Sequence, residues 1–289
     1  MEITLDLAQR LVADQFPEFS ELSIEPVASG GTDNAIFRLG PDLSLRLPKR
    51  LDAVGQVEKE QIWLPRLSPL PLRIPKPVKQ GAPSQGYPHP WSIYDWCPGS
   101  PLFESAPKDW PETVDQLAEF LKVLQSKDTM GAPKSGAQNH FRGVELERRD
   151  PLTRGAIDGV SDLYDAATMT SVWETSFAAP KFAAEPVWLH GDLQGGNLLV
   201  AQGQLAAVID FGLSGIGDPA CDLIVAWSVL PAAVRSRFRV LMDCDDAMWQ
   251  RGKGWALSVA VIALDYYRDR NARLSAISRQ TIEAVLEPD

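Results

Sequence analysis

Three polar residues whose types suit phosphoryl transfer lie within residues 188–212. Asp192 and Asn197 are five positions apart in a glycine-containing loop, and Asp210 follows the apolar run 205–209. Phosphoryl transfer to a hydroxyl group needs a carboxylate that accepts or orients the hydroxyl proton, and oxygen ligands that hold Mg²⁺ beside the phosphates. We therefore predict that Asp192 is the base and that Asn197 and Asp210 bind Mg²⁺.

A β-hairpin is expected to bring the two metal ligands together. The apolar runs 198–200 and 205–209 flank a short polar turn, in which Gly203 favours a hairpin. Asn197 and Asp210 would then lie at neighbouring positions of the hairpin, where both can bind one hard cation. Taken singly, Asp210 could be a turn residue and residues 190–192 an ordinary loop. The occurrence of both motifs in this order favours the catalytic interpretation.

The order of the remaining elements predicts an α+β fold in which strands and helices are segregated. Hydrophobic periodicity and turn residues predict strands at 22–28, 35–39, 43–47, 77–79 and 91–94, and helices at 54–67, 111–126, 144–166, 168–178, 220–241, 246–269 and 275–287. The composition changes once, near residues 97–101. We therefore place an N-terminal nucleotide-binding lobe at 1–97 and a C-terminal catalytic and acceptor-binding lobe at 98–289.

Composition narrows the classes of function. The 289-residue chain has 38 acidic and 28 basic residues and a formal charge of −10, which argues against a nucleic-acid partner. No apolar run approaches the roughly 20 residues that a membrane-spanning helix needs, and the start of the chain lacks the pattern of a secretory signal. Cys97, Cys221 and Cys244 are far apart and form no CxxC pair, as expected in a reducing cytoplasm. We expect a cytoplasmic enzyme, with a monomer as the default.

The two motifs resemble those of the aminoglycoside phosphotransferase family, whose members share a bilobal protein kinase-like fold. His190-Gly191-Asp192 with Asn197 resembles the catalytic loop of the family, and residues 209–212 resemble its metal-binding motif. The resemblance covers nearly the whole chain, although only these two motifs are highly specific. Many protein kinases carry an arginine at the position of Gly191 that links the catalytic loop to a phosphorylated activation loop. The presence of glycine instead of this arginine favours a small-molecule kinase over a regulated protein kinase.

The resemblance also implies nucleotide-binding residues in the N-terminal lobe. A loop that would cover the triphosphate consists of Ser29, Gly30, Gly31, Thr32, Asp33 and Asn34. Arg46 stands where the family usually has a phosphate-binding lysine, and we expect it to pair with Glu60 rather than Glu58. The hinge between the lobes would hydrogen-bond a purine through the backbone of Asp95, Trp96 and Cys97. His190 and Asp222 are expected to support the site without reacting.

The implied activity is transfer of the γ-phosphate of ATP or GTP to a hydroxyl group of an aminoglycoside-like or other antibiotic, which would give antibiotic resistance. The acceptor pocket would be built by residues 131–165 and the C-terminal helices, where acidic side chains are numerous enough to receive a cationic molecule. A metabolic kinase for a sugar, a choline-like amine or an amino alcohol would use the same residues. A non-catalytic nucleotide-binding protein is the third hypothesis, favoured only by the arginine at position 46.

Overall fold

The computed structural model describes residues 3–27 and 33–287. Contacts between residues divide the chain into two compact units. Unit 1 consists of Met1–Gly99 and Ala206–Gly212, and unit 2 of Ser100–Leu205 and Leu213–Asp289. The segment that carries Asp210 therefore packs with unit 1, whereas a single boundary near residue 97 would assign it to the C-terminal lobe.

Unit 1 contains a five-stranded sheet with the strand order β1-β2-β3-β5-β4. Every pair of neighbouring strands is antiparallel, as expected for a meander of short strands. The strands are β1 (Ile24–Pro26), β2 (Asn34–Leu39), β3 (Leu43–Pro48), β4 (Pro77–Gly81) and β5 (Trp91–Asp95). All five lie where the sequence predicts a strand.

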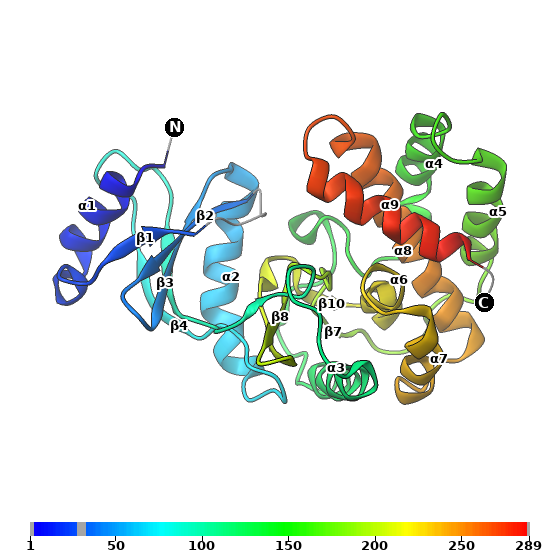
Figure 1. Cartoon of the computed structure of the whole chain (residues 1–289), viewed down its shortest axis with the longest axis horizontal. Helices are drawn as coiled ribbons and strands as arrows, with labels where there is room; N and C mark the ends of the chain where they lie inside the picture. Colours follow the sequence, from blue (N-terminus) through cyan, green and yellow to red (C-terminus); the bar gives the residue numbers. More distant parts are fainter. Residues whose placement is uncertain (1–2, 28–32, 288–289) are drawn as a thin grey trace. The chain divides into compact units, whose positions relative to one another are not determined.

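The alternation of side chains along β3 gives the sheet of unit 1 two different faces. Leu45 and Leu47 are fully buried in a core with Leu7 and Leu11 of helix α1 (Leu5–Gln15). Arg46 points to the opposite face, where its guanidinium group meets helix α2 (Leu51–Leu67). The strands thus lie between α1 and α2 (Figure 1). The apolar face stabilises the sheet, and the α2 face carries charged groups.

Unit 2 is mainly helical. Its helices are α3 (Trp110–Gln125), α4 (Asp150–Gly159), α5 (Ala166–Phe177), α6 (Val225–Ser228), α7 (Ala232–Leu241), α8 (Asp246–Tyr267) and α9 (Ala272–Leu286). Helix α8 packs against α4, α5 and α9, which surround it in Figure 1. Among residues 3–27 and 33–287, every helix is too short or insufficiently apolar to cross a lipid bilayer.

Short strands carry the predicted chemical motifs. Strands β7 (Val187–Leu189) and β10 (Gly215–Gly217) form an antiparallel pair, and β6 (Ser100–Pro101), β8 (Leu198–Ala201) and β9 (Gln204–Val208) form a second sheet. Gln202 and Gly203, between β8 and β9, have φ values of 56° and 88°. Two consecutive positive φ values are typical of the turn that closes a two-residue hairpin. The predicted hairpin is therefore present.

Two predicted helices are shorter than expected, and a proline lies at or directly before the start of α4 and of α7. The helix predicted at 144–166 is reduced to α4, in whose first turn Pro151 lies. The helix predicted at 220–241 is replaced by a 3-10 helix (Pro219–Ile224), α6 and α7, with Pro231 directly before α7. Proline has no backbone N–H to donate and fits only the start of a helix.

Candidate functional site

Asp192 lies in the loop between β7 and β8 of unit 2, and its carboxylate is held on one side. Its Oδ2 accepts hydrogen bonds from Gln194 Nε2 at 3.0 Å and from Asn197 Nδ2 at 2.9 Å. Its side chain is 23 % exposed. One carboxylate oxygen is therefore fixed by two donors, which orients the group while it remains open to a small molecule.

Asn197 closes this loop through its amide nitrogen. Nδ2 donates to the backbone carbonyl of Asp192 at 2.9 Å as well as to its carboxylate. No donor within the described residues bonds the amide oxygen of Asn197. An oxygen ligand for a cation is thus presented by the side chain that also positions Asp192.

A buried carboxylate supports the loop from behind. Asp222 is 1 % exposed, and its two oxygens accept hydrogen bonds from the backbone N–H groups of His190 and Gly191, both at 2.7 Å. Burial raises the pKa of Asp222, while the nearby His190 and the two hydrogen bonds act in the opposite direction. His190 Nδ1 in turn accepts from the N–H of Asp192 at 3.2 Å. Asp222 and His190 therefore both bond the backbone of this loop.

The backbone at position 191 requires glycine. Gly191 has a φ of +81°, and a Cβ at this position would lie 2.5 Å from the backbone oxygen of Leu213. Any side chain would thus combine an unfavourable backbone conformation with a collision against main chain. The loop can follow this path only with glycine.

Replacing Gly191 by alanine is expected to destabilise unit 2 and to lower catalytic turnover. The left-handed conformation alone costs about 1–2 kcal/mol for a residue with a Cβ, and the Leu213 carbonyl must also move. Urea unfolding and kcat measure the two effects. Gly155→Ala is the matched control, because Gly155 lies in α4 and a Cβ there would meet nothing within 4 Å. Equal unfolding midpoints for Gly191→Ala and the wild type would contradict this account of the loop.

Arg142 is a neighbour of Asp192 that the sequence did not predict. Its Nη2 lies 3.8 Å from Asp192 Oδ1, and the guanidinium side chain is 13 % exposed. The preceding residues His140 and Phe141 have positive φ values of 51° and 58°. Arg142 lies in a glycine-rich loop fifty positions before Asp192. Nothing in the sequence indicates that the two side chains are close. The hydrogen bond from Gln194 to Asp192 depends on the side-chain rotamer of Gln194, which the sequence does not indicate.

In unit 1, Arg46 connects two carboxylates. Its Nη1 lies 3.1 Å and 3.3 Å from the two oxygens of Glu60, and its Nη2 lies 3.3 Å from Asp210 Oδ1. Tyr94 also donates to Glu60, at 2.6 Å. Burial opposes the charge of Arg46, but Glu60 and Asp210 raise its pKa. The ion pair predicted between Arg46 and Glu60 is present, whereas Glu58 is exposed.

Asp210 adopts an unusual backbone conformation at the end of the segment that packs with unit 1. Its φ is 66°, and its side chain is 41 % exposed. Lys59 of α2 donates a hydrogen bond to the carbonyl oxygen of Gly212, two residues further on. Burial lowers the pKa of Lys59 to about 8, while the charges of Glu60 and Asp210 act in the opposite direction. The sequence does not indicate this contact of Lys59, since the candidates for the partner of Arg46 in this segment are Glu58 and Glu60.

Only part of the predicted triphosphate loop can be placed. Ser29, Gly30, Gly31 and Thr32 lie outside the described residues. The carbonyl of Asp33 accepts from Lys49 N–H at 2.7 Å, and Asn34 is buried at the start of β2. Asp33 Oδ2 also accepts from Gln56 Nε2 of α2 at 3.4 Å. Helix α2 therefore connects to the end of this loop.

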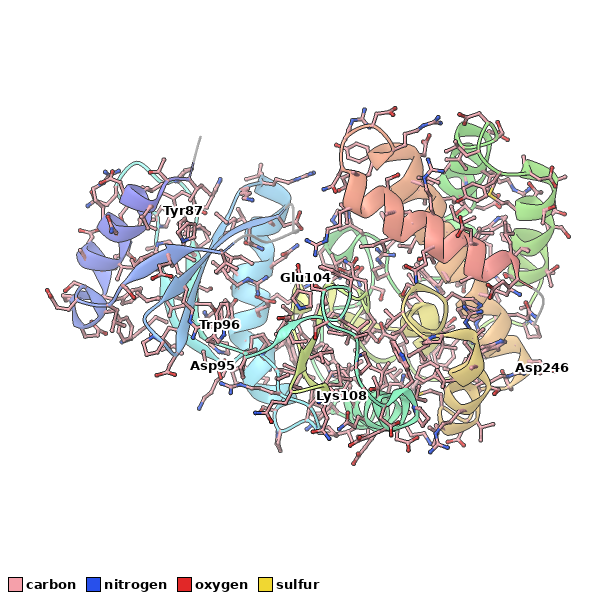
Figure 2. The ribbon with its side chains drawn as sticks, viewed as in Figure 1. Tyr87, Asp95, Trp96, Glu104, Lys108 and Asp246 are labelled. Carbon is pink, nitrogen blue, oxygen red and sulfur yellow. The ribbon has the colours of Figure 1, made fainter. Side chains whose placement is uncertain are left out.

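The predicted hinge follows β5, where Figure 2 labels Asp95 and Trp96. The N–H of Asp95 donates to the carbonyl of Lys76 at 2.9 Å, and the N–H of Trp96 donates to that of Asp42 at 2.7 Å. The guanidinium group of Arg38 lies 4.0 Å from the centre of the Trp96 ring. Of the three N–H groups of the hinge, only that of Cys97 has no acceptor in the described part of the chain.

Asn197 and Asp210 each present an oxygen donor of the kind that binds a hard cation. No group of three or more His, Cys, Asp or Glu side chains that could hold a metal ion occurs among residues 3–27 and 33–287. Mg²⁺ does not need such a group, because it is usually bound by one or two protein oxygens together with phosphates and water. The carboxylate of Asp210 and the amide oxygen of Asn197 are hard oxygen donors of this kind. Asp210 belongs to unit 1 and Asn197 to unit 2.

A cavity of about 320 Å³ lies elsewhere in unit 2. It is lined by residues 143–147, by the end of α5 with the segment that follows, and by Asp218 and Arg251. The last two form a buried ion pair, with Arg251 Nε 2.7 Å from Asp218 Oδ2. No residue predicted for the catalytic, nucleotide or metal site lines this cavity.

Comparison with known proteins agrees with the motifs and the fold. A family model described as the phosphotransferase enzyme family (APH) matches residues 23–255, whereas no curated protein sequence matches the chain significantly. The GDP and kanamycin complex of APH(2")-IIIa is similar with a TM-score of 0.74 and 23 % identity over 96 % of both chains.

Two further structures extend this likeness. The gentamicin complex of APH(2")-IIa has a TM-score of 0.62 and 17 % identity over 100 % of this chain and 98 % of that one. A thermostable mutant of APH(4)-Ia with AMP-PNP and hygromycin B has a TM-score of 0.64 and 18 % identity over 96 % and 97 %. The predicted protein kinase-like fold, with its antiparallel-sheet and helical parts, is confirmed. Since the family model covers most of the sequence, the chain belongs to the phosphotransferase enzyme family.

Proposed function

We propose that the enzyme transfers the γ-phosphoryl group of ATP or GTP to a hydroxyl group of a small molecule, with Asp192 as the base. The observation that carries this proposal is the environment of Asp192. Two side-chain donors fix one oxygen of its carboxylate, while the group stays 23 % exposed at the surface of the loop. A carboxylate that is oriented but accessible is what the acceptor hydroxyl requires.

The proposed reaction assigns a separate task to each group. Asp192 accepts the proton of the acceptor hydroxyl as its oxygen forms a bond to the γ-phosphorus, and the bond from that phosphorus to the bridging oxygen breaks. The nucleoside diphosphate leaves, and Asp192 later returns the proton to solvent. Asn197 and Gln194 keep the carboxylate in place through these steps. Asp222 holds the backbone of His190 and Gly191, so that the loop does not relax as charge moves.

Asn197 and Asp210 would hold Mg²⁺ together with the phosphates. The fit rests on the amide oxygen of Asn197, which accepts no hydrogen bond from residues 3–27 and 33–287, and on the partly exposed carboxylate of Asp210. When bound, the ion would neutralise the charge of the β- and γ-phosphates. Arg46 would add positive charge to the same region. Asn197 lies in the motif that resembles the catalytic loop of the family, and Asp210 in the motif that resembles its metal-binding segment, which supports this role.

The nucleotide would bind to unit 1. Its phosphates would lie under the loop from Ser29 to Asn34 and near Arg46, whose position Glu60 and Tyr94 fix. Its purine would bind the hinge of Asp95, Trp96 and Cys97. Because the N–H groups of Asp95 and Trp96 already have acceptors, the donor that we assign to the purine is the N–H of Cys97.

The first acceptor class to test is that of the aminoglycosides. Related structures are complexes with kanamycin, gentamicin and hygromycin B, and they support an acceptor of this class. Acidic side chains of unit 2 could receive the ammonium groups of such a molecule. Some of these acidic side chains already form ion pairs within unit 2, however. Glu145 and Glu147 pair with Lys181, and Asp162 pairs with Arg268.

This pairing favours a second candidate, a metabolic kinase for a sugar, a choline-like amine or an amino alcohol, each of which carries at most one positive charge. Asp243 and Asp246 also form surface ion pairs, with Lys122 and Arg239. A sugar or an amino alcohol would need fewer free carboxylates than a polycationic antibiotic does. The same phosphoryl-transfer residues would serve either acceptor.

A coupled assay of ADP or GDP release tests the proposal. The enzyme is supplied with Mg²⁺ and ATP or GTP and with aminoglycosides, macrolides, choline, sugars and amino alcohols, and phosphorylated products are identified by mass spectrometry. Acceptor-dependent release that is absent in Asp192→Ala would support a kinase and identify its acceptor class. Nucleotide binding without turnover across the whole panel would favour the non-catalytic hypothesis.

A further inference from the structure

Three polar side chains occupy one face of α2, at positions 56, 59 and 60. Residues three and four positions apart lie beside one another on a helix, so Gln56 is a neighbour of both Lys59 and Glu60. Gln56 and Glu60 are 7 % and 3 % exposed. Each of the three side chains contacts a segment that is predicted to bind nucleotide or metal. Helix α2 therefore holds more of the site than the single carboxylate of the Arg46–Glu60 pair.

Two of these side chains converge on the turn that follows Asp210. Lys59 Nζ donates to the carbonyl oxygen of Gly212, and a Cβ on Gly212 would lie 2.5 Å from Gln56 Oε1. Gly212 is thus enclosed by two neighbouring residues of α2. Asp210 itself has a φ of 66°, in the left-handed region that Asp and Asn enter more often than other residues with a Cβ. The bond from Lys59 to Gly212 restrains the backbone two residues further on.

The carboxylates on this face share one arginine and lie near a lysine. Arg46 is shared between Glu60 and Asp210, through different nitrogens of one planar group. Two carboxylates therefore depend on a single guanidinium group, and both also interact electrostatically with Lys59. Lysine differs from arginine in carrying a compact charge on a flexible stem. Lys59 can balance the carboxylates while it bonds the main chain at Gly212.

We propose that Lys59 is a positioning residue for the metal-binding carboxylate: it holds the turn from Asp210 to Gly212 against α2 and, with Arg46, balances the charge of Asp210 and Glu60. The inference rests on the proposed role of Asp210 as a Mg²⁺ ligand. Groups that orient a metal ligand without touching the metal typically contribute about 10–100-fold to metal affinity or activity. The consequence is a dependence of magnesium-assisted nucleotide binding on Lys59.

Isothermal titration calorimetry of ADP and GDP, with Mg²⁺ and with EDTA, tests this role without any acceptor. Lys59→Met is expected to weaken binding of the magnesium complex by about 10-fold or more, while the affinity for nucleotide in EDTA changes little. Lys59→Arg retains a charged donor and should recover part of the loss, whereas Lys59→Gln retains only a donor and should recover less. Thermal unfolding of the ligand-free variants shows whether they are folded.

Lys79→Met is the matched control. Lys79 lies in β4 of the same unit and pairs with Glu18, far in sequence from the metal motif. If Lys59→Met does not fold, Lys59→Gln takes its place in the comparison. Equal magnesium-dependent affinities in wild type and the tested Lys59 variant would overturn the inference, as would a wild-type nucleotide affinity that does not depend on Mg²⁺. An absence of turnover with every acceptor would instead count against the proposed function alone.

Discussion

Replacement of Asp192 by asparagine is expected to lower kcat by about 10²–10⁴-fold, the usual contribution of a positioned general base. Asparagine has nearly the same shape but cannot accept the proton of the acceptor hydroxyl. Its amide oxygen can still receive a hydrogen bond from Asn197 or Gln194, so the loop should keep its path. The affinity for nucleotide, which unit 1 is proposed to bind, should change little.

Steady-state kinetics with the acceptor found in the panel, together with calorimetry of nucleotide binding, measures both effects. Asp14→Ala is a suitable control, because Asp14 is an exposed residue of α1 that belongs to unit 1 and has no proposed role. A kcat for Asp192→Asn close to that of the wild type would show that another group accepts the proton. The assignment of the base would then be wrong.

Replacement of Asp222 by alanine is expected to destabilise the enzyme by about 2–6 kcal/mol, since each buried N–H without an acceptor costs about 1–3 kcal/mol. The two donors affected are the backbone N–H groups of His190 and Gly191, whose hydrogen bonds to Asp222 are both 2.7 Å long. Turnover should fall as well, because these residues immediately precede Asp192. Asp222→Asn retains one acceptor oxygen and should lose less stability.

Urea unfolding followed by tryptophan fluorescence gives the difference in the free energy of unfolding. Asp158→Ala provides a control in unit 2, because Asp158 is exposed on α4, and it should change stability by no more than about 0.5 kcal/mol. If Asp222→Ala unfolds at the wild-type urea concentration, water or another group must satisfy the two N–H donors. Asp222 would then not be the support of the loop.

Local patterns in the sequence were sufficient to predict the sheet of unit 1. Its five strands are short apolar or alternating segments separated by turn residues, and both signals act over short distances along the chain. The same applies to the hairpin of β8 and β9, whose turn at Gln202 and Gly203 has the required positive φ values. The helices near Pro151 and Pro231 begin later than hydrophobic periodicity alone indicates, since proline has no N–H to donate within a helix.

The residues of the candidate site were predicted unevenly for a related reason. Asp192, Asn197 and Asp210 lie in compact motifs, so their types and spacing suggest chemistry directly. Arg142 reaches Asp192 from a separate loop, and Lys59 reaches Gly212 from a helix. Contacts of this kind depend on tertiary packing, which no spacing rule in a single sequence reports. Arg46 and Glu60 could be paired in advance only because a family resemblance supplied their positions.

The two faces of the sheet in unit 1 should tolerate different kinds of substitution. The core under α1 consists of apolar side chains such as Leu45 and Leu47, whereas the face under α2 carries Arg46 and its carboxylate partners. Because neighbouring residues of one strand serve opposite faces, a shift of β3 by one residue would bury the arginine in the core. Substitutions that conserve volume beneath α1 leave these charges in place. Stability and activity can therefore evolve through different residues of the same strand, and stabilising mutations should accumulate on the α1 side.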